Sequence, residues 1–312
     1  MLFILKTKDV SLKLNIFRHV HSVSLILCMK FTIITPAYNM SSTLGRAIES
    51  VLAQTYPDRE MVVIENIRPG EKRLENTYED KPGIRILSGT FGDRSEARNF
   101  GIAHSDGDYI TFLDADDALD PGYLEHFSEI FRQDPDCIAI SDILKIEEGK
   151  GRHWQKAGLY QGNPLKYAVN EGNITFAARR GYFLEQPFEY DYWEDKLWLG
   201  RMGEKHPFKF TGKPDYQYYI TSKIFSESDF HHSMNIETEA INALYAGLSA
   251  PYALKYPKTS ALNDFYIKKA YVALSLGLKE IANDLITQRI KKGLSIKTFL
   301  RWSKLKWEYL TQ

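Results

Sequence analysis

The sequence predicts an α/β fold in which a mostly parallel central sheet lies between helices, followed by a C-terminal helical appendage. Three observations lead to this prediction. The candidate strands are continuous apolar runs, which is typical of strands buried on both faces. Helical segments separate these strands, so that consecutive strands run in parallel. The 312 residues, of which 44% are hydrophobic and 13% aromatic, are enough for a sizeable core.

The alternation of strand and helix starts at residue 29. Apolar and β-branched runs predict strands at residues 31–35, 61–64, 84–87 and 109–113. Apolar positions at helical spacing predict helices around residues 47–52 and 97–103. Ligands of such sheets bind at the carboxyl ends of the strands. The functional site is therefore expected in the segments that directly follow the strands.

Three segments are predicted along the chain. Residues 1–28 form an N-terminal extension whose part in the fold stays open, because charged residues interrupt its apolar run and no signal-peptide cleavage site follows. Residues 29–232 form the α/β domain. Residues 233–312 form a helical region with 3.6-spaced apolar positions such as Ile241 and Leu244. No run is long and apolar enough for a transmembrane helix.

The composition excludes several classes of protein. Forty basic and forty acidic residues cancel to a net charge of zero, so no overall field attracts nucleic acid, and no nucleic-acid partner is expected. The two cysteines, Cys28 and Cys137, are too few for a disulfide framework or a thiolate zinc site. Such low cysteine usage fits the reducing cytoplasm.

The basic residues gather at the C-terminal end. Residues 289–312 hold seven Lys and Arg residues against one Glu, interleaved with apolar residues and two Trp. A basic amphipathic helix of this kind lies on an anionic membrane surface, which predicts peripheral contact with the inner face of the plasma membrane. The alternative is a terminal helix that packs its apolar stripe onto the α/β domain. The sequence leaves both open.

Three carboxylates, Asp114, Asp116 and Asp117, follow the strand predicted at residues 109–113. Acidic side chains this close repel one another unless a cation lies between them. Carboxylate oxygens at a strand end suit a hard divalent ion, Mn²⁺ or Mg²⁺, that also binds a diphosphate. The alternative is a solvated turn that caps the next helix with Asp120. We predict metal and nucleotide binding at this turn.

Two further segments hold candidate binding residues. Residues 35–39, Thr-Pro-Ala-Tyr-Asn, follow the first strand without the glycine pattern of a dinucleotide site. Their hydroxyl, proline and aromatic ring suit stacking on a base, although Pro and Asn also form ordinary turns. Arg94 and Arg98 are four residues apart, so on a helix they project from one face towards phosphates or the acidic turn. The alternative for Arg98 is an ion pair with a neighbouring carboxylate.

Taken together, these segments resemble the family 2 glycosyltransferases, which have the GT-A nucleotide-diphospho-sugar transferase fold. The resemblance extends from about residue 29 to about residue 230. It rests on Thr-Pro-Ala-Tyr-Asn at residues 35–39, Ser-Val-Leu-Ala-Gln-Thr at 50–55, Ala-Arg-Asn-Phe-Gly at 97–101 and the Asp-x-Asp motif at 113–117. It implies a catalytic domain at residues 29–232. It also implies transfer of a sugar from a nucleotide-diphosphate sugar, most often a UDP-sugar, to an acceptor hydroxyl with a divalent metal.

The resemblance assigns roles to the residues that match the family's motifs. The loop after the first strand frames the base, Asp114 lies near the ribose or the donor sugar, and Asp116 binds the metal. Glu65 and Asn66 stand where the family usually has an Asp-Asp pair, which leaves the identity of the base open. The expected nucleotide site holds Thr35, Pro36, Tyr38, Glu65, Asn66, Arg94, Arg98, Asp114 and Ala115.

The resemblance also places a general base at the aspartate of a Glu-Asp pair, here Glu194 and Asp195. Asp195 is expected to deprotonate the acceptor hydroxyl as it attacks the anomeric carbon opposite the diphosphate, which inverts the configuration. The alternative is a pair of acids that the dipole of the following helix stabilises. Because some related enzymes use a late histidine, His231 is a second candidate metal ligand. A surface pair with His232 is its alternative.

We therefore predict an inverting glycosyltransferase that extends a polysaccharide or a lipid-linked glycan. The aromatic segment at residues 182–198 is expected to line the acceptor side. Two other functions stay open. A nucleotidyltransferase shares the paired aspartates, but it usually has a glycine-rich, basic segment that residues 35–45 lack. A catalytically decayed sugar-nucleotide-binding protein is the other alternative, because of the departure at Glu65 and Asn66.

Overall fold

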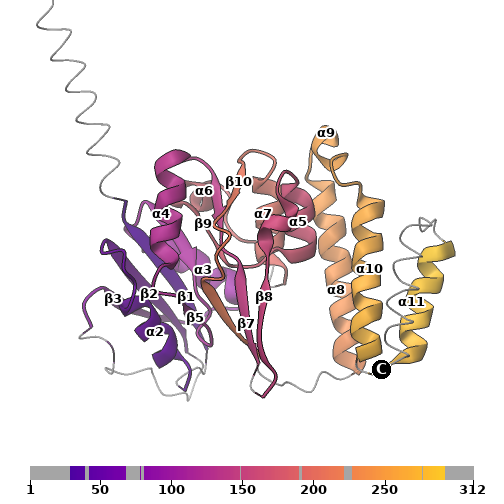
Figure 1. Cartoon of the computed structure of the whole chain (residues 1–312), viewed down its shortest axis with the longest axis horizontal. Coiled ribbons are helices and arrows are strands. Elements are labelled where there is room, and N and C mark those ends of the chain that lie inside the picture. Colours follow the sequence, from indigo (N-terminus) through magenta and orange to yellow (C-terminus); the bar gives the residue numbers. More distant parts are fainter. Residues whose placement is uncertain are drawn as a thin grey trace, which may run out of the picture.

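The chain forms an α/β part followed by a row of helices (Figure 1). The computed structural model describes residues 29–38, 42–67, 78, 81–147, 149–189, 192–220, 227–275 and 277–291. The N-terminal extension and residues 292–312 lie outside the described residues, as do the predictions made for them. Among the residues that the model describes, no helix is long and apolar enough to cross a membrane.

A seven-stranded sheet forms the centre of the α/β part. Its strands lie in the order β10 (Phe208–Phe210), β6 (Ile138–Ile140), β9 (Phe176–Arg179), β4 (Tyr109–Phe112), β1 (Phe31–Ala37), β2 (Arg59–Asn66) and β3 (Ile84–Gly89). Only β9 runs antiparallel to its neighbours, β4 and β6. The prediction of a mostly parallel sheet is confirmed.

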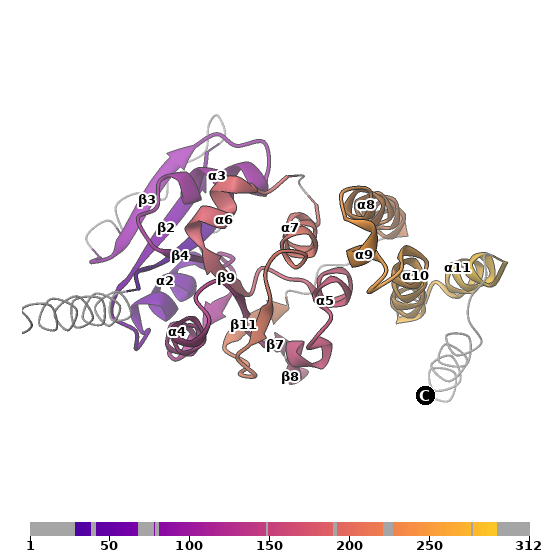
Figure 2. The ribbon, with the colours of Figure 1, turned by 90° about the horizontal axis from the view of Figure 1, so that it is seen from above.

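Helices cover both faces of this sheet, as Figure 2 shows. One face carries α3 (Arg94–Ala103) and α6 (Arg180–Glu185), and the other carries α2 (Leu44–Leu52) and α4 (Tyr123–Gln133). α3 comes close to the sheet at Gly101, where an added Cβ would stand 2.9 Å from the Ile34 Cγ2 atom. This close approach holds the first residues of α3 beside the carboxyl ends of β1 and β2.

A smaller sheet follows the carboxyl end of β4. Its strands lie in the order β5 (Ala118–Leu119), β11 (Tyr216–Ile220), β7 (Ile143–Glu147) and β8 (Gly151–Gln155). The short 3-10 helix η1 (Ala157–Tyr160) and α5 (Pro164–Glu171) come next in the chain, and α7 (Glu194–Met202) packs against α5. Through β5 and β11, this sheet reaches the acidic turn that follows β4.

The helical region consists of α8 (Glu227–Ala246), α9 (Ala250–Ala253), α10 (Lys258–Ser275) and α11 (Lys279–Lys291). Its buried residues form a second core cluster, which also includes Leu165 of α5 and Leu197 of α7. The predicted boundary between residues 232 and 233 falls inside α8, because the helix has already begun at Glu227. The helical region therefore packs directly onto α5 and α7, which carry part of the site.

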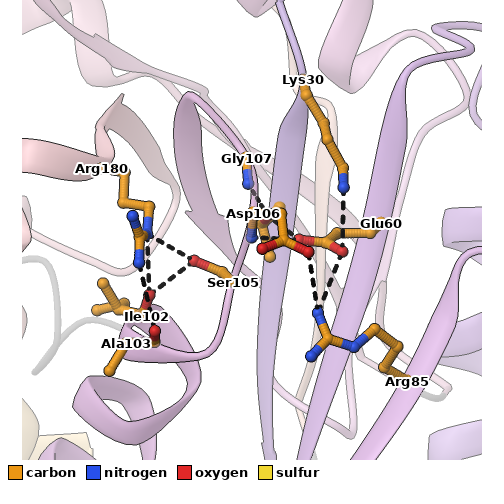
Figure 3. A network of polar contacts seen from close by, with 10 residues as sticks. Lys30, Glu60, Arg85, Ile102, Ala103, Ser105, Asp106, Gly107 and Arg180 are labelled. Atoms are coloured by element: carbon orange, nitrogen blue, oxygen red, sulfur yellow. Dashed lines mark hydrogen bonds and ion pairs between the residues drawn. The ribbon is translucent and has the colours of Figure 1, made fainter.

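A buried carboxylate fastens the amino ends of three strands (Figure 3). Glu60, near the start of β2, accepts hydrogen bonds from the Thr32 hydroxyl at 2.7 Å and the Asp106 N–H at 2.8 Å. Lys30 and Arg85 pair with it at 3.3 Å and 3.5 Å. Burial by itself raises the pKa of Glu60, but these hydrogen bonds and Lys30 outweigh burial and lower the pKa. Its charge therefore stabilises the folded state.

We expect Glu60→Ala to lower the free energy of unfolding at pH 7 by about 2–3 kcal/mol, because hydrogen bonds to a charged group contribute about 1.5–3 kcal/mol. The exposed Glu49, which pairs with Lys81, is the matched control, and Glu49→Ala should cost less than about 1 kcal/mol. Because the folded-state pKa of Glu60 is lowered, the difference from wild type should shrink as the pH falls through that pKa. Urea unfolding at pH 7 and pH 3 measures both effects.

Candidate active site

Three parallel strands end at one edge of the main sheet and bring distant segments together. Tyr38 follows β1, Asn66 ends β2, and Asp114 follows β4. Beside this edge lies a hollow of about 410 Å³, here named the central hollow. Its lining residues are Arg94, Arg98, Asp114, Lys145, Gln155, Asn170, Glu171, Gly172, Asn173, Ile174, Tyr192, Trp193, Glu194, Asp195, Lys196, Tyr218 and Lys268.

A buried arginine joins the two acidic segments of the central hollow. The Arg98 side chain is 1% exposed, and its Nη2 atom lies 2.9 Å from Asp114 Oδ1. Its Nη1 atom donates to Glu194, 96 residues away along the chain. Burial by itself lowers the pKa of Arg98, but the neighbouring Asp114 and Glu194 carboxylates outweigh it and raise the pKa. The Arg98 guanidinium thus forms ion pairs with Asp114 of the acidic turn and with Glu194.

The turn after β4 is held by β11 and α2. The Asp114 N–H donates to the Tyr216 hydroxyl at 3.1 Å, and the Tyr219 N–H donates to Asp117 Oδ1 at 2.9 Å. Arg46 donates to the Asp116 carbonyl and lies 3.6 Å above the Tyr219 ring. Burial and the nearby Asp114 raise the pKa of Asp117 to about 8. A cation bound at this turn would favour the charged form of Asp117.

The acidic turn holds two carboxylates that could serve as part of a metal site. Among the described residues, no group of three or more His, Cys, Asp and Glu side chains could hold a metal ion by itself. A Mg²⁺-type ion in a phosphate-transfer site needs only one or two carboxylates, since the substrate phosphates and water complete its shell. Asp114 and Asp116, which share one short turn, fit this oxygen donor set.

Asp195 lies at the start of α7 and lines the same hollow as Asp114. Burial and the adjacent Glu194 carboxylate raise the pKa of Asp195 to about 7, against the opposing effects of Lys196 and Arg98. Trp193, the residue before α7, has a left-handed backbone with φ of 64°, which is unusual for a bulky residue. Its ring packs edge-to-face on Phe265 of α10, at a centroid distance of 6.1 Å. The helical region thus helps to hold the backbone that presents Asp195.

The residues predicted to bind the base lie at the strand edge but do not line the central hollow. Thr35 is buried, and its hydroxyl has no hydrogen-bond partner among the described residues. Pro36 is partly buried, and Tyr38 is 37% exposed. Ala115 is buried in the turn. The Glu65 carboxylate accepts a hydrogen bond from Ser88 at 2.6 Å.

Asn66 forms hydrogen bonds within the domain. Its amide donates to the Phe91 carbonyl at 2.9 Å and accepts from the Phe91 N–H at 3.0 Å. Both ends of the amide therefore hold the segment that leads into α3. Arg94, the first residue of α3, is more exposed than Arg98, and its Nη2 atom lies 3.9 Å from Glu194 Oε2.

His231 and most of the aromatic segment lie away from the central hollow. His231 lies on α8 and lines a separate hollow with residues of α10 and α11, such as Tyr266 and Glu280, and neither Asp114 nor Asp116 lines that hollow. In the aromatic segment at residues 182–198, Phe183, Phe188 and Trp198 belong to the main core. Of its described aromatic residues, Tyr192 and Trp193 line the central hollow. Phe183 lies on the buried side of α6 and Trp198 on that of α7, so these rings pack into the main core.

Several lining residues were not predicted from the sequence. Lys145 comes from β7, Glu171 from α5, Lys196 from α7 and Lys268 from α10. Lys196 directly follows the predicted Asp195, whereas no local pattern marks Lys145, Glu171 or Lys268 as a site residue. Only the approach of four separate elements brings them to one hollow.

Comparisons with known proteins agree with this architecture. The family model described as Glycosyl transferase family 2 matches residues 32–190. A curated relative, the poly(ribitol-phosphate) beta-N-acetylglucosaminyltransferase TarP of Staphylococcus aureus, is 28% identical over 241 residues, which are 70% of this chain and 72% of TarP.

Two solved structures share the fold. The structure of S. aureus TarS in complex with UDP-GlcNAc has a TM-score of 0.55 and 16% identity, and the match covers 84% of this chain and 89% of that one. The mannosyltransferase PcManGT from Pyrobaculum calidifontis, in complex with GDP-Man and Mn²⁺, has a TM-score of 0.59 and 13% identity over 90% of this chain and 81% of that one. The predicted GT-A fold is confirmed.

Proposed function

Because the chain belongs to glycosyltransferase family 2, we propose that its central hollow transfers a sugar from a nucleoside diphosphate sugar, a UDP-sugar, to an acceptor hydroxyl with inversion. One observation carries this proposal. Asp195, whose pKa is raised to about 7, lines the same hollow as Asp114 of the acidic turn and Arg98. A general base is most effective when its pKa lies near the working pH.

The chain's own residues account for the steps of a direct displacement. Asp195 takes the proton of the acceptor hydroxyl while that oxygen forms its bond to the anomeric carbon of the donor. The bond between this carbon and the diphosphate oxygen breaks on the opposite face. Arg98 holds Asp114 and Glu194 in place, and Arg94 presents a partly exposed cation at the hollow, near the phosphates of the donor.

A divalent ion, Mn²⁺ or Mg²⁺, would be held by Asp116 and Asp114 and would neutralise the charge that develops on the leaving diphosphate. The exposed Tyr38 ring, directly after β1, supports binding of the base there. In this proposal His231 has no part in the metal site, because it lines a different hollow.

We propose a glycan or polyol-phosphate polymer of the cell envelope as acceptor. A lipid-linked glycan would offer the same kind of acceptor hydroxyl. The relative TarP supports a polyol-phosphate polymer, since its name describes a poly(ribitol-phosphate) glycosyltransferase. The proposed site of action is the cytoplasm, with residues 289–312 as a contact to the inner face of the plasma membrane. The raised pKa of Asp195 favours an active enzyme over a decayed binding protein.

A donor screen tests the proposed function. We expect UDP-GlcNAc with Mn²⁺ to raise the melting temperature of the full chain, because a ligand that binds only the folded state stabilises it. GDP-mannose with Mn²⁺ is the matched alternative donor. Removing the metal with EDTA should abolish the shift and also the slow hydrolysis of the donor. A chain that neither binds nor hydrolyses any nucleotide sugar would contradict the proposal.

A further inference from the structure

Three lysines surround the acceptor side of the central hollow. Lys145 and Lys196 are partly buried, and Lys268 is 56% exposed. Burial and the charge of Lys268 lower the pKa of Lys145, and they also lower the pKa of Lys196, to about 8. The Lys268 ammonium group is therefore close enough to repel both Lys145 and Lys196.

Two lining carboxylates act on these lysines. Asp195, adjacent to Lys196 in the chain, opposes the lowering of the Lys196 pKa, and Glu171 does so for both Lys145 and Lys196. Glu171 also accepts hydrogen bonds from Gln155 at 2.7 Å and from Tyr160 at 3.2 Å, and it lies 3.6 Å from Lys268 Nζ. The Lys145 side chain forms no ion pair or hydrogen bond with any described residue. Five Lys and Arg side chains but four Asp and Glu side chains line the central hollow, so an anion would relieve the excess positive charge.

A second hollow continues from this side. It has a volume of about 470 Å³ and lies between η1, α5 and α10, and it is here named the α5–α10 hollow. It shares Asn170, Glu171 and Lys268 with the central hollow. Tyr160 and Tyr271 give it aromatic faces, and Tyr271 is 49% exposed. Aromatic faces beside hydrogen-bonding groups suit the rings or chains of a polyhydroxylated ligand, and the shared residues place the two hollows side by side.

We propose that Lys145, Lys196 and Lys268 form a subsite for an anionic group, a phosphodiester or a carboxylate, of a polymeric acceptor that continues into the α5–α10 hollow. This inference rests on the proposed function, because it takes Asp195 as the point where the acceptor hydroxyl reacts. Arg94, Arg98 and Asp114 line the nucleotide side of the central hollow, so these lysines serve the other substrate. Lys196 and Lys268 lie beyond residues 32–190, which the family model matches.

Binding of labelled polymers to the full chain tests this subsite. The probes are a poly(glycerol phosphate) oligomer, an oligogalacturonate and a neutral dextran of the same length, with and without saturating UDP and Mn²⁺. We expect one of the two polyanions to bind about tenfold or more tightly than dextran, and the better one identifies the anionic group. Binding should weaken with salt. Equal binding of dextran, or no binding of either polyanion, would overturn the proposal.

Lys145→Met is the informative variant, because the Lys145 side chain makes no hydrogen bond with any described residue. It should weaken polyanion binding about tenfold, as expected for one lost charge-assisted contact. Lys258→Met, an exposed lysine on α10 outside both hollows, should change nothing. The affinity for UDP should stay the same in Lys145→Met. An equal loss of UDP affinity would show that Lys145 belongs to the donor site and would overturn the proposal. Failure of wild type to bind UDP would instead contradict the proposed function.

Discussion

Asp195→Asn is expected to lower the rate of sugar transfer by about 10²–10⁴-fold, the usual contribution of a general base. Because the folded-state pKa of Asp195 is raised to about 7, the free energy of unfolding falls as the pH rises from the ordinary Asp pKa to about 7, and it then stays at the lower value. Asn carries no charge, so the variant should melt at a higher temperature than wild type at pH 8 and at the same temperature at pH 4. Donor consumption and thermal unfolding measure the two effects.

The direction of the stability change separates the two roles considered for Asp195. If Asp195 only stabilised the start of α7 through the helix dipole, Asn would lower the melting temperature at pH 8. A variant that is less stable at pH 8 and keeps its transfer rate would therefore remove Asp195 as the base. Asp58→Asn, at an exposed site, is the matched control, and neither its rate nor its melting temperature should change. In wild type, kcat/KM should rise with pH up to about 7 and then level off.

Arg98→Met is expected to lower the free energy of unfolding by about 3–5 kcal/mol, because it leaves Asp114 and Glu194 without their buried partner. This is a large part of the stability of a typical domain. The variant should also lose donor binding, since Asp114 is no longer held in place. Urea unfolding at pH 7 measures the first effect, and the thermal shift with UDP and Mn²⁺ measures the second.

Arg179→Met is the matched control for this change. Arg179 pairs with Asp136 at 2.7 Å, but both side chains are well exposed, so its loss should cost at most about 1 kcal/mol. Adding Glu194→Gln to Arg98→Met should recover part of the lost stability, because one of the two uncompensated charges is removed. Equal losses in Arg98→Met and Arg179→Met would show that Arg98 does not compensate buried charge.

Much of the α/β part could be predicted from local sequence. Continuous apolar runs predicted β1, β2, β3 and β4, since a strand buried on both faces has no polar side to interrupt it. The same pattern located the acidic turn, because Asp114 and Asp116 come directly after a buried strand. The role of Asn66 was beyond such reasoning, because its partner, Phe91, is 25 residues away.

The sequence by itself determined the α/β fold class and the family, and it pointed to Asp114, Arg98 and Asp195, because runs, spacings and motifs lie within short stretches of chain. Only the tertiary structure decided that Arg98 joins Asp114 to Glu194, and that Lys268 of the helical region reaches the same hollow as Asp195. Charges so far apart in the chain interact only after packing has brought their elements together. Their burial and pairing, and thus their pKa values, are properties of that packing.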